Sequence, residues 1–435
     1  MKNTVLRLMS LLIPTVILVL YIIIFPCNET PENRNVDNAE SRNSAQKDDS
    51  KQENTSDRSN DKNNESMIAV WVPYMSLDME GTDRSENAYR NKINEIFNNI
   101  SELGADAVIF QVRPFCDALY NSGLFPSSHI ISGTQGTEIS YDPLKIATEE
   151  AHKRNLQLHA WVNPLRVRTK DTPSYLSEKN PVSVWKNDDI KDNDRYYFES
   201  GGGIYLNPAY PEVRKLIING VREIVKNYDI DGIQIDDYFY PADDNECDKN
   251  DYDDYVRTTQ EQTLSFNEWR MQNINELVRG LYHCVHSEKK ECIFGISPQC
   301  NTENDMKIGA DIYSWSSVSG YADYICPQVY VSESHPVLTF QESVTEWRDM
   351  IKNNHVKLYI GLAVYKVGTD ADSGTWLLKD DNIRSQAELA NQLGADGIML
   401  YSYDQLFTEK AEKDVRSAVK VFKELTDQPS QKVNS

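Results

Sequence analysis

The stretch DGIQIDDYFYP at residues 231–241 joins a short apolar run to two adjacent carboxylates and three aromatic rings. Its isoleucines alternate with Gln234 and Asp236, so a strand would turn its apolar side chains one way and its polar ones the other. The run ends in Asp236 and Asp237, which repel each other and are costly to bury. A carboxylate pair beside aromatic rings suits glycoside chemistry. An Asp-Asp turn that caps a helix is the ordinary structural alternative.

Short apolar strands of this kind alternate with amphipathic helices along the chain. The helix-to-strand turn GADAV at 104–108 recurs as GADGI at 394–398, and IDGI at 230–233 resembles both. Eight such units within about 360 residues predict an α/β fold, a (β/α)8 TIM barrel. A doubly wound open sheet is the second choice, because no GxGxxG follows any strand. The expected strands are Ile68–Tyr74, Ala107–Arg113, Leu156–Asn163, Gly232–Asp237, Ile293–Gln299, Tyr324–Tyr330, Lys357–Tyr365 and Gly397–Tyr403, and the clearest helices are Arg90–Leu103, Pro211–Tyr228, Asn267–His286 and Ser385–Leu393.

The N-terminal residues 1–27 have the pattern of a membrane anchor. Basic residues precede an apolar run at 8–25 that is nearly long enough to cross a bilayer, and acids follow it. This asymmetry predicts that the N-terminus stays inside and the remainder is exported. We therefore expect a cell-membrane protein, single-pass or lipid-anchored, with an extracytoplasmic domain. An uncleaved anchor is the first choice, and a lipidated Cys27 is the second.

The remaining boundaries follow from composition. Residues 28–66 are rich in Asn, Asp, Glu, Ser and Lys and almost devoid of apolar side chains, which predicts a disordered linker. The barrel is expected at 67–425, and a polar tail at 426–435. The formal net charge of −22 argues against nucleic acid as a partner. The membrane is expected as a partner only through the N-terminal anchor.

Cysteines and histidines indicate no metal or other cofactor. The seven cysteines show no CxxC or zinc-type spacing, and the histidines form no HxH or HExxH arrangement. Cys284 and Cys292 could pair in an oxidising compartment, which the sequence leaves open. A metal-dependent deacetylase is poorly supported, because no His-His-Asp set gathers at the strand ends.

Polar residues gather where a barrel keeps its active site, at the C-terminal ends of the strands. Asp236 shares the inward parity of Gln234, whereas Asp237 faces away or reaches the mouth from above the rim. One carboxylate could then be desolvated, with a raised pKa, while the other stays ionised. We take Asp236 and Asp237 as the catalytic candidates. The expected substrate-binding residues are Arg113, Trp161, Asn163, Gln234, Tyr238, Gln328, Tyr330, Tyr365 and Asp404.

Two long connections follow expected strands on this face. One runs from Asp117 to Asp142, and the other covers some forty residues after Asn163 and includes Trp185. Long loops on the functional face of a barrel commonly build the walls of a substrate site. A structurally neutral insertion is the alternative for either loop.

Five motifs together resemble the glycosyl-hydrolase-like 10 family. They are AWVNP at 160–164, DGIQIDDYFYP at 231–241, GISP at 295–298, PQVY at 327–330 and YIGLA at 359–363, and the likeness runs from about Ile68 to Asp404. Members are bacterial envelope proteins, often lipoproteins, with a (β/α)8 barrel. At least one is regarded as cleaving peptidoglycan glycan strands that lack stem peptides. The resemblance implies a cell-wall glycan hydrolase whose partner is a cell-wall polysaccharide.

A looser likeness connects the fourth strand to chitinase-type barrels, whose motif reads DGxDxDxE. Asp231, Asp236 and Tyr330 fit that pattern, but Gln234 replaces an Asp and Tyr238 stands where the acid would be. Asp237 could take over the acid role, with the N-acetyl group of the substrate as internal nucleophile. The rival interpretation is a non-catalytic glycan-binding barrel that keeps the aromatic rings and has lost the acid.

Overall fold

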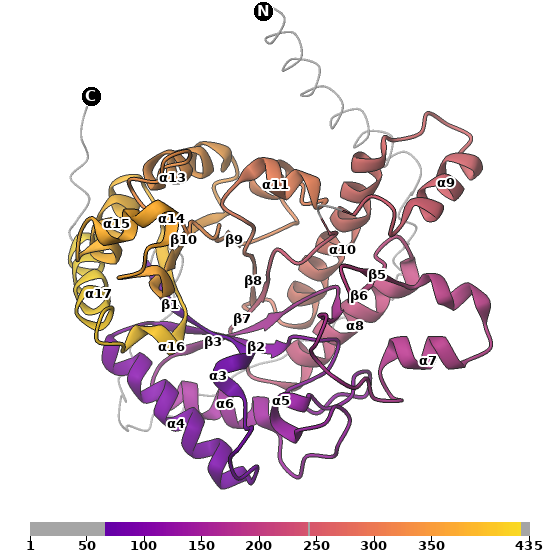
Figure 1. The fold of residues 1–435 in the computed structure, drawn as a ribbon, viewed down its shortest axis with the longest axis horizontal. Helices are drawn as coiled ribbons and strands as arrows, with labels where there is room; N and C mark the ends of the chain where they lie inside the picture. Colours follow the sequence, from indigo (N-terminus) through magenta and orange to yellow (C-terminus); the bar gives the residue numbers. More distant parts are fainter. Residues whose placement is uncertain (1–65, 242–243, 428–435) are drawn as a thin grey trace, which may run out of the picture. The chain divides into compact units, whose positions relative to one another are not determined.

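The barrel expected from the sequence is present. The computed structural model describes residues 66–241 and 244–427, so the expected anchor, nearly all of the linker and most of the tail lie outside the described residues. Eight parallel strands close into a barrel, and helices surround it (Figure 1). Within the described ranges, no helix is long and apolar enough to cross a membrane.

The strands follow one another around the barrel in the order β1-β11-β10-β9-β8-β7-β3-β2, and β2 pairs with β1 to close it. One of the eight expected ranges matches its strand at both ends, and the others end one to five residues later than the strands do. Beyond the strand ends only isolated bridges continue, such as Gln299 to Gln328 and Gln328 to Gly361. The strands are β1 (Met67–Val72), β2 (Ala107–Arg113), β3 (Gln157–Val162), β7 (Gly232–Ile235), β8 (Ile293–Ile296), β9 (Tyr324–Ile325), β10 (Lys357–Ala363) and β11 (Gly397–Tyr401).

The repeated helix-to-strand turn has a structural purpose. The side chain of Asp106, which precedes β2, accepts a hydrogen bond from the backbone N–H of Ile68 on β1 at 2.9 Å. Asp231, Asp323 and Asp396 make the same contact with strands β3, β8 and β10, at 2.6–2.9 Å. Each carboxylate satisfies a backbone donor at the N-terminal end of the neighbouring strand, where the ladder has not yet begun. Asp231 therefore lies at the opposite end of β7 from Asp236.

Alternating side chains fill the barrel interior. Trp71, Trp161, Tyr324, Tyr359 and Met399 belong to one buried cluster, which is separate from the larger core between strands and helices. A Cβ on Gly295 would overlap the ring of Tyr324, so glycine is the residue that lets this ring fit. The alternation of apolar and polar residues along β7 thus separates an outer core from an inner column of aromatic and polar groups.

The outer helices are amphipathic, as their sequence pattern predicts, and several begin at capping residues. Ser265 and Thr339 each form a capping box, and Gly104 ends its helix in the left-handed conformation with φ of 89°. The main outer helices are α4 (Glu86–Leu103), α6 (Pro143–His152), α8 (Pro211–Asn227), α10 (Phe266–Glu288), α13 (Phe340–Met350), α15 (Asn382–Gln392) and α17 (Glu412–Thr426).

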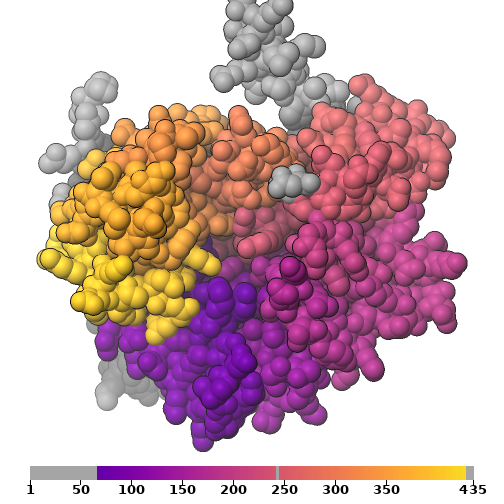
Figure 2. Space-filling model, viewed as in Figure 1, coloured from indigo at the N-terminus to yellow at the C-terminus, as the bar shows by residue number. Residues whose placement is uncertain are grey.

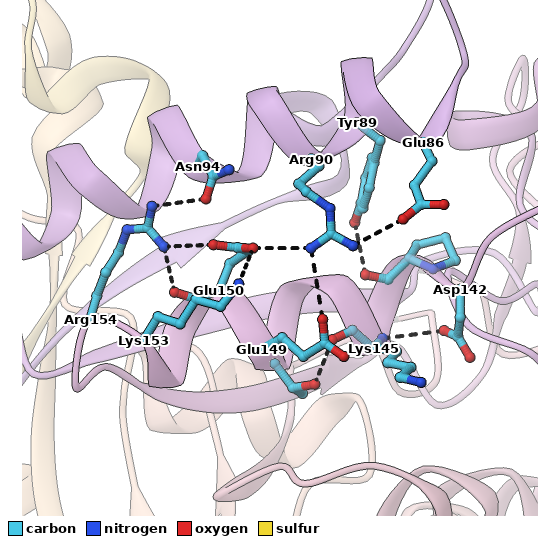
Figure 3. A network of polar contacts seen from close by, with 12 residues as sticks. Glu86, Tyr89, Arg90, Asn94, Asp142, Lys145, Glu149, Glu150, Lys153 and Arg154 are labelled. Carbon is cyan, nitrogen blue, oxygen red and sulfur yellow. Dashed lines mark hydrogen bonds and ion pairs between the residues drawn. The ribbon is translucent and has the colours of Figure 1, made fainter.

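A polar network joins α4 to α6 (Figure 3). Its centre is Glu150, which is 4% exposed and accepts hydrogen bonds from Arg90, Lys153 and Arg154 at 2.8–3.0 Å. Burial opposes ionisation of Glu150, but these three cations outweigh it and hold the pKa of Glu150 below its ordinary value. The network therefore stabilises the packing of the two helices while Glu150 is ionised.

The loop after β3 contains secondary structure that the sequence pattern did not indicate. It forms a three-stranded antiparallel sheet in the order β4-β6-β5, made of β4 (Arg166–Arg168), β5 (Tyr197–Ser200) and β6 (Gly203–Leu206). Helix α9 (Lys249–Thr258) is fastened to this insertion because Asp251 accepts hydrogen bonds from Asn207 and Tyr210 at 2.7 Å. The other short helices are α3 (Tyr74–Leu77), α5 (His129–Ser132), α7 (Pro181–Asn187), α11 (Thr302–Lys307), α12 (Ile312–Ser317), α14 (Ala371–Gly374) and α16 (Tyr403–Leu406).

The face of the molecule drawn in Figure 2 is hollowed near its centre, where segments from the beginning, middle and end of the barrel sequence meet.

The six cysteines among the described residues are all free, so Cys284 and Cys292 are not paired. The remaining cysteine, Cys27, lies outside the described residues.

Candidate active site

Asp236 lies directly after β7 at the mouth of the barrel and is only 3% exposed. Its Oδ2 accepts a hydrogen bond from Trp161 Nε1 at 2.9 Å and a second one from Asn163 Nδ2. Both donors come from the end of the adjacent strand β3, which pairs with β7 in register. The carboxylate is therefore held in one orientation by two N–H donors from its neighbour.

The amide of Asn163 is itself oriented by a second layer of contacts. Its Oδ1 accepts hydrogen bonds from Gln111 Nε2 at 2.5 Å and from an Arg166 guanidinium nitrogen at 3.0 Å. Gln111 in turn accepts a hydrogen bond from the backbone N–H of Tyr74 at 2.8 Å. Because two donors occupy Oδ1, the Nδ2 group of Asn163 must point toward Asp236.

Asp237 reaches the mouth from the rim, the second of the two positions that its parity allowed. Strand β7 ends at Ile235, so the strict alternation no longer applies to the residues that follow. Asp237 Oδ1 accepts a hydrogen bond from Gln328 Nε2 at 2.8 Å. Asp237 is more exposed than Asp236, which leaves it the member of the pair better placed to meet a ligand.

The two carboxyls perturb each other. Burial, followed by repulsion from Asp237, raises the pKa of Asp236 to about 7. Burial also raises the pKa of Asp237, although the hydrogen bond from Gln328 opposes this rise. The positive charge of Arg166 lowers the pKa of both groups. The pair therefore titrates as a unit and retains a proton closer to neutral pH than a free Asp does.

Arg166 is a site residue that the sequence reasoning missed. Its guanidinium lies 4.5 Å from the centre of the Tyr238 ring and 4.8 Å from that of Phe115, and its Nε donates to the Pro114 carbonyl at 2.9 Å. It is 7% exposed and is the cation that acts on both carboxyls. Its position three residues after Asn163, just beyond a predicted strand end, was the signal that could have identified it.

Aromatic rings line one side of the mouth. The ring centres of Tyr330 and Tyr401 are 5.5 Å apart, and those of Tyr330 and Tyr365 are 5.8 Å apart. Tyr365 is 40% exposed, and Tyr238, on the Arg166 side, is 46% exposed. Exposed rings beside a carboxylate pair offer flat apolar surfaces of the kind on which sugar faces stack. Tyr330, Tyr365 and Tyr401 together form what we call the tyrosine wall.

Gln234 and Arg113 lie away from the open mouth. Gln234 is fully buried one layer below Asp236, where it accepts from Trp71 Nε1 at 2.6 Å and donates to Tyr324. The register of β2 shifts between Gln111 and Arg113, which breaks the alternation on which the inward prediction depended. Arg113 lies instead over the Phe125 ring at 4.7 Å, against α8, and is 1% exposed.

Asp404 lies at the rim and not with the carboxylate pair. It is exposed on α16 and accepts a hydrogen bond from Ser76 Oγ at 2.7 Å. The structure thus brings Asp236 and Asp237 together with four of the expected binding residues and places the tyrosine wall beside them. The four are Trp161, Asn163, Tyr238 and Gln328. It separates Arg113 from this group.

A family model and two similar proteins all connect this chain with glycosyl hydrolases. The model of the family described as glycosyl hydrolase-like 10 matches residues 66–377. The chain is 32% identical over 348 residues to glycosyl hydrolase YngK of Bacillus subtilis, covering 75% of this chain and 65% of that protein, so it spans somewhat less than two thirds of this relative. It is 32% identical over 319 residues to glycosyl hydrolase DigH of Escherichia coli strain K12, covering 68% of this chain and 71% of that protein.

Solved structures share the fold at low sequence identity. The glycoside hydrolase domain of PgaB from Bordetella bronchiseptica superposes with a TM-score of 0.54 at 11% identity, covering 82% of this chain and 99% of that one. A β-galactosidase from Marinomonas ef1 gives a TM-score of 0.53 at 10% identity, covering 84% of this chain and 62% of that one. At this level of identity, the likeness concerns the barrel fold alone.

Proposed function

This chain belongs to the glycosyl hydrolase-like 10 family, and from that premise we propose that it is an extracytoplasmic glycoside hydrolase of the cell wall. Its proposed substrate is the peptidoglycan glycan strand lacking stem peptides. The observation that carries the proposal is the coupled carboxylate pair with raised pKa values, held by oriented donors beside exposed aromatic rings. A carboxyl that keeps its proton near neutral pH can protonate a glycosidic oxygen.

The proposed roles of the two carboxyls follow from their positions. Asp237 is the more exposed and can reach the leaving-group oxygen of a polymer lying across the mouth, so we assign it the role of proton donor. Asp236 lies deeper, held by Trp161 and Asn163, and its negative charge after proton loss would stabilise positive charge developing on the sugar. When the shared proton is on Asp237, Asp236 is ionised. The water that attacks the sugar after the leaving group departs returns a proton to Asp237.

The tyrosine wall and the insertion after β3 complete the proposed binding surface. Tyr365 in the tyrosine wall and Tyr238 over the Arg166 guanidinium are both exposed, so more than one ring is available to the sugars of a bound polymer. The proposed location outside the cytoplasm depends on the predicted anchor at 1–27. A membrane-anchored enzyme with a long linker would act on wall polymer near the membrane surface.

Incubation of the purified full-length chain with peptide-free glycan strands, followed by mass spectrometry of the products, tests this function. We expect soluble fragments from wild type and none from D236N. D237N should release none from the strands, yet should retain measurable hydrolysis of an aryl glycoside, whose leaving group needs no protonation.

Glu412→Gln is the control, because Glu412 is a partly exposed carboxylate on the outer helix α17, paired with Arg416 at 2.9 Å and without contact to the catalytic pair; it should keep turnover. Strand binding without product from any form, wild type included, would indicate the rival function of a glycan-binding barrel. Equal loss of both substrates in D237N would refute its role as the proton donor.

A further inference from the structure

A third carboxyl lies behind the catalytic pair. Asp305, on α11, is fully buried, and its Oδ1 accepts a hydrogen bond from the backbone N–H of Gln299 at 3.0 Å. Its Oδ2 is also buried and has no hydrogen-bond donor among the described residues. An ionised oxygen in such a place is costly, because nothing replaces the water it has lost. The position therefore favours the neutral carboxyl.

Gln299 connects this buried carboxyl to Asp237. Just beyond the ends of β8 and β9, Gln299 and Gln328 form an isolated parallel bridge, and the Gln328 backbone N–H donates to the Pro298 carbonyl at 3.0 Å. The two glutamines thus lie side by side at the mouth. The Gln328 amide donates to Asp237 at 2.8 Å, and the Gln299 side chain, at the neighbouring strand end, also lowers the pKa of Asp237.

Two titratable groups face Asp305. Asp237 acts on it from the segment after β7, and Cys300 lies near it in the loop after β8. Burial raises the pKa of Asp305 well above its ordinary value, and repulsion from Asp237 adds to the rise, whereas the Gln299 hydrogen bond opposes it. A neutral Asp305 keeps its acceptor oxygen for Gln299 without adding a third negative charge to the site.

We propose that Asp305 is a positioning residue, which fixes the main chain at Gln299 so that the Gln299 side chain is directed at Asp237. The effect on catalysis passes through Gln299, and Asp305 itself does not touch the substrate. This role rests on the proposed function, because it concerns the proton donor of that reaction. It also explains why a side chain with an acceptor oxygen is buried here, since an apolar residue of the same size would leave the Gln299 N–H unpaired.

Kinetics of five full-length proteins test the proposal: wild type, D305N, D305L, Q299L and the D305L/Q299L double variant. D305N keeps an acceptor oxygen and is neutral, so its kcat and pH profile should match those of wild type. D305L and Q299L should each lower kcat at least about tenfold with KM within about twofold. Both should also move the high-pH limb of kcat/KM to higher pH, because the pKa of Asp237 rises when the Gln299 contact is lost. The D305L/Q299L double variant should be no worse than either single one.

The outcomes separate the possibilities. An unmoved pH limb in Q299L, or additive losses in the double variant, would overturn the route through Gln299. A shift of the limb to lower pH in D305N would mean that Asp305 acts as a charge, and would overturn the proposal as well. If D305L does not fold, Q299L and D305N decide the question alone. Wild-type turnover with unaffected variants refutes only the positioning role, whereas absence of wild-type turnover refutes the proposed function and this role with it.

Discussion

Replacing Asp236 by Asn should stabilise the protein while abolishing its activity. The pKa of Asp236 is raised to about 7 in the folded protein from an ordinary 3.8, so the folded state resists ionising this group. For a carboxyl with a raised pKa, the cost to folding is absent below the unfolded pKa, grows as pH rises above it, and levels off above the folded pKa. Asn keeps an oxygen that can accept from Trp161 and Asn163 and carries no charge.

The size of the effect follows from the pKa values. A difference of roughly three pKa units at about 1.36 kcal/mol each gives a cost of up to about 4 kcal/mol at pH 8, and less than half of that at pH 5. We therefore expect the free energy of unfolding of D236N to exceed that of wild type by about 2–4 kcal/mol at pH 8, and by clearly less at pH 5.

Urea unfolding followed by tryptophan fluorescence at the two pH values measures this difference. Asp253→Asn is the control, because Asp253 is an exposed carboxylate paired with Lys249 at 3.1 Å on α9, and its replacement should change stability little at either pH. A D236N protein that is no more stable than wild type at pH 8, or whose gain in stability is the same at pH 5, would refute the argument that burial and repulsion raise the pKa of this carboxyl.

Three further changes test other contacts. If the proposed function holds, Arg166→Met should lower kcat/KM at least about tenfold and move the high-pH limb of activity upward, because Arg166 lowers the pKa of Asp236 and Asp237; an unmoved limb would count against this role. Glu150→Gln should cost stability at neutral pH, and its difference from wild type should vanish as pH falls through the lowered pKa of Glu150, as acid titration of unfolding would show. His286→Asn removes a contact with Asp323 at 3.2 Å, which, with burial opposing it, raises the pKa of His286. The stability difference between wild type and H286N should be largest below about pH 6.5 and should fade as pH rises through the folded pKa. A pH-independent difference in melting temperature would contradict this.

The folding pattern could be predicted from local sequence because it repeats. Period-two apolar runs, amphipathic helices and recurring GAD turns each report a short-range preference, and eight repetitions of them have few compact solutions. The catalytic candidates were also accessible, since Asp236 and Asp237 follow an apolar strand and barrel function lies at strand ends. Strand ends were less predictable, because the last residues of a strand are decided by which neighbours continue the ladder.

Other features depend on contacts between distant parts of the chain. A register shift in β2 turned Arg113 toward α8, and no pattern in the sequence marks that irregularity. Arg166 became a site residue because the loop after β3 places its guanidinium over the Tyr238 ring beyond the end of β7, which depends on packing and not on spacing. Asp305 stands out only through its burial and its hydrogen bond from the Gln299 backbone. The three-stranded sheet after β3 is held by pairings within a loop that has weak periodicity.

The sequence by itself determined the barrel, the family and the position of the carboxylate pair, because these follow from local periodicity and from residues adjacent in the chain. Only the tertiary structure decided how the two carboxyls differ. The burial of Asp236, the partial exposure of Asp237 and the donors that reach each one come from the end of β3, with Trp161 and Asn163, and from the segment after β9, with Gln328. Desolvation and charge repulsion depend on the distance to such groups in space, so the pKa values of the pair could not be read from its place in the chain.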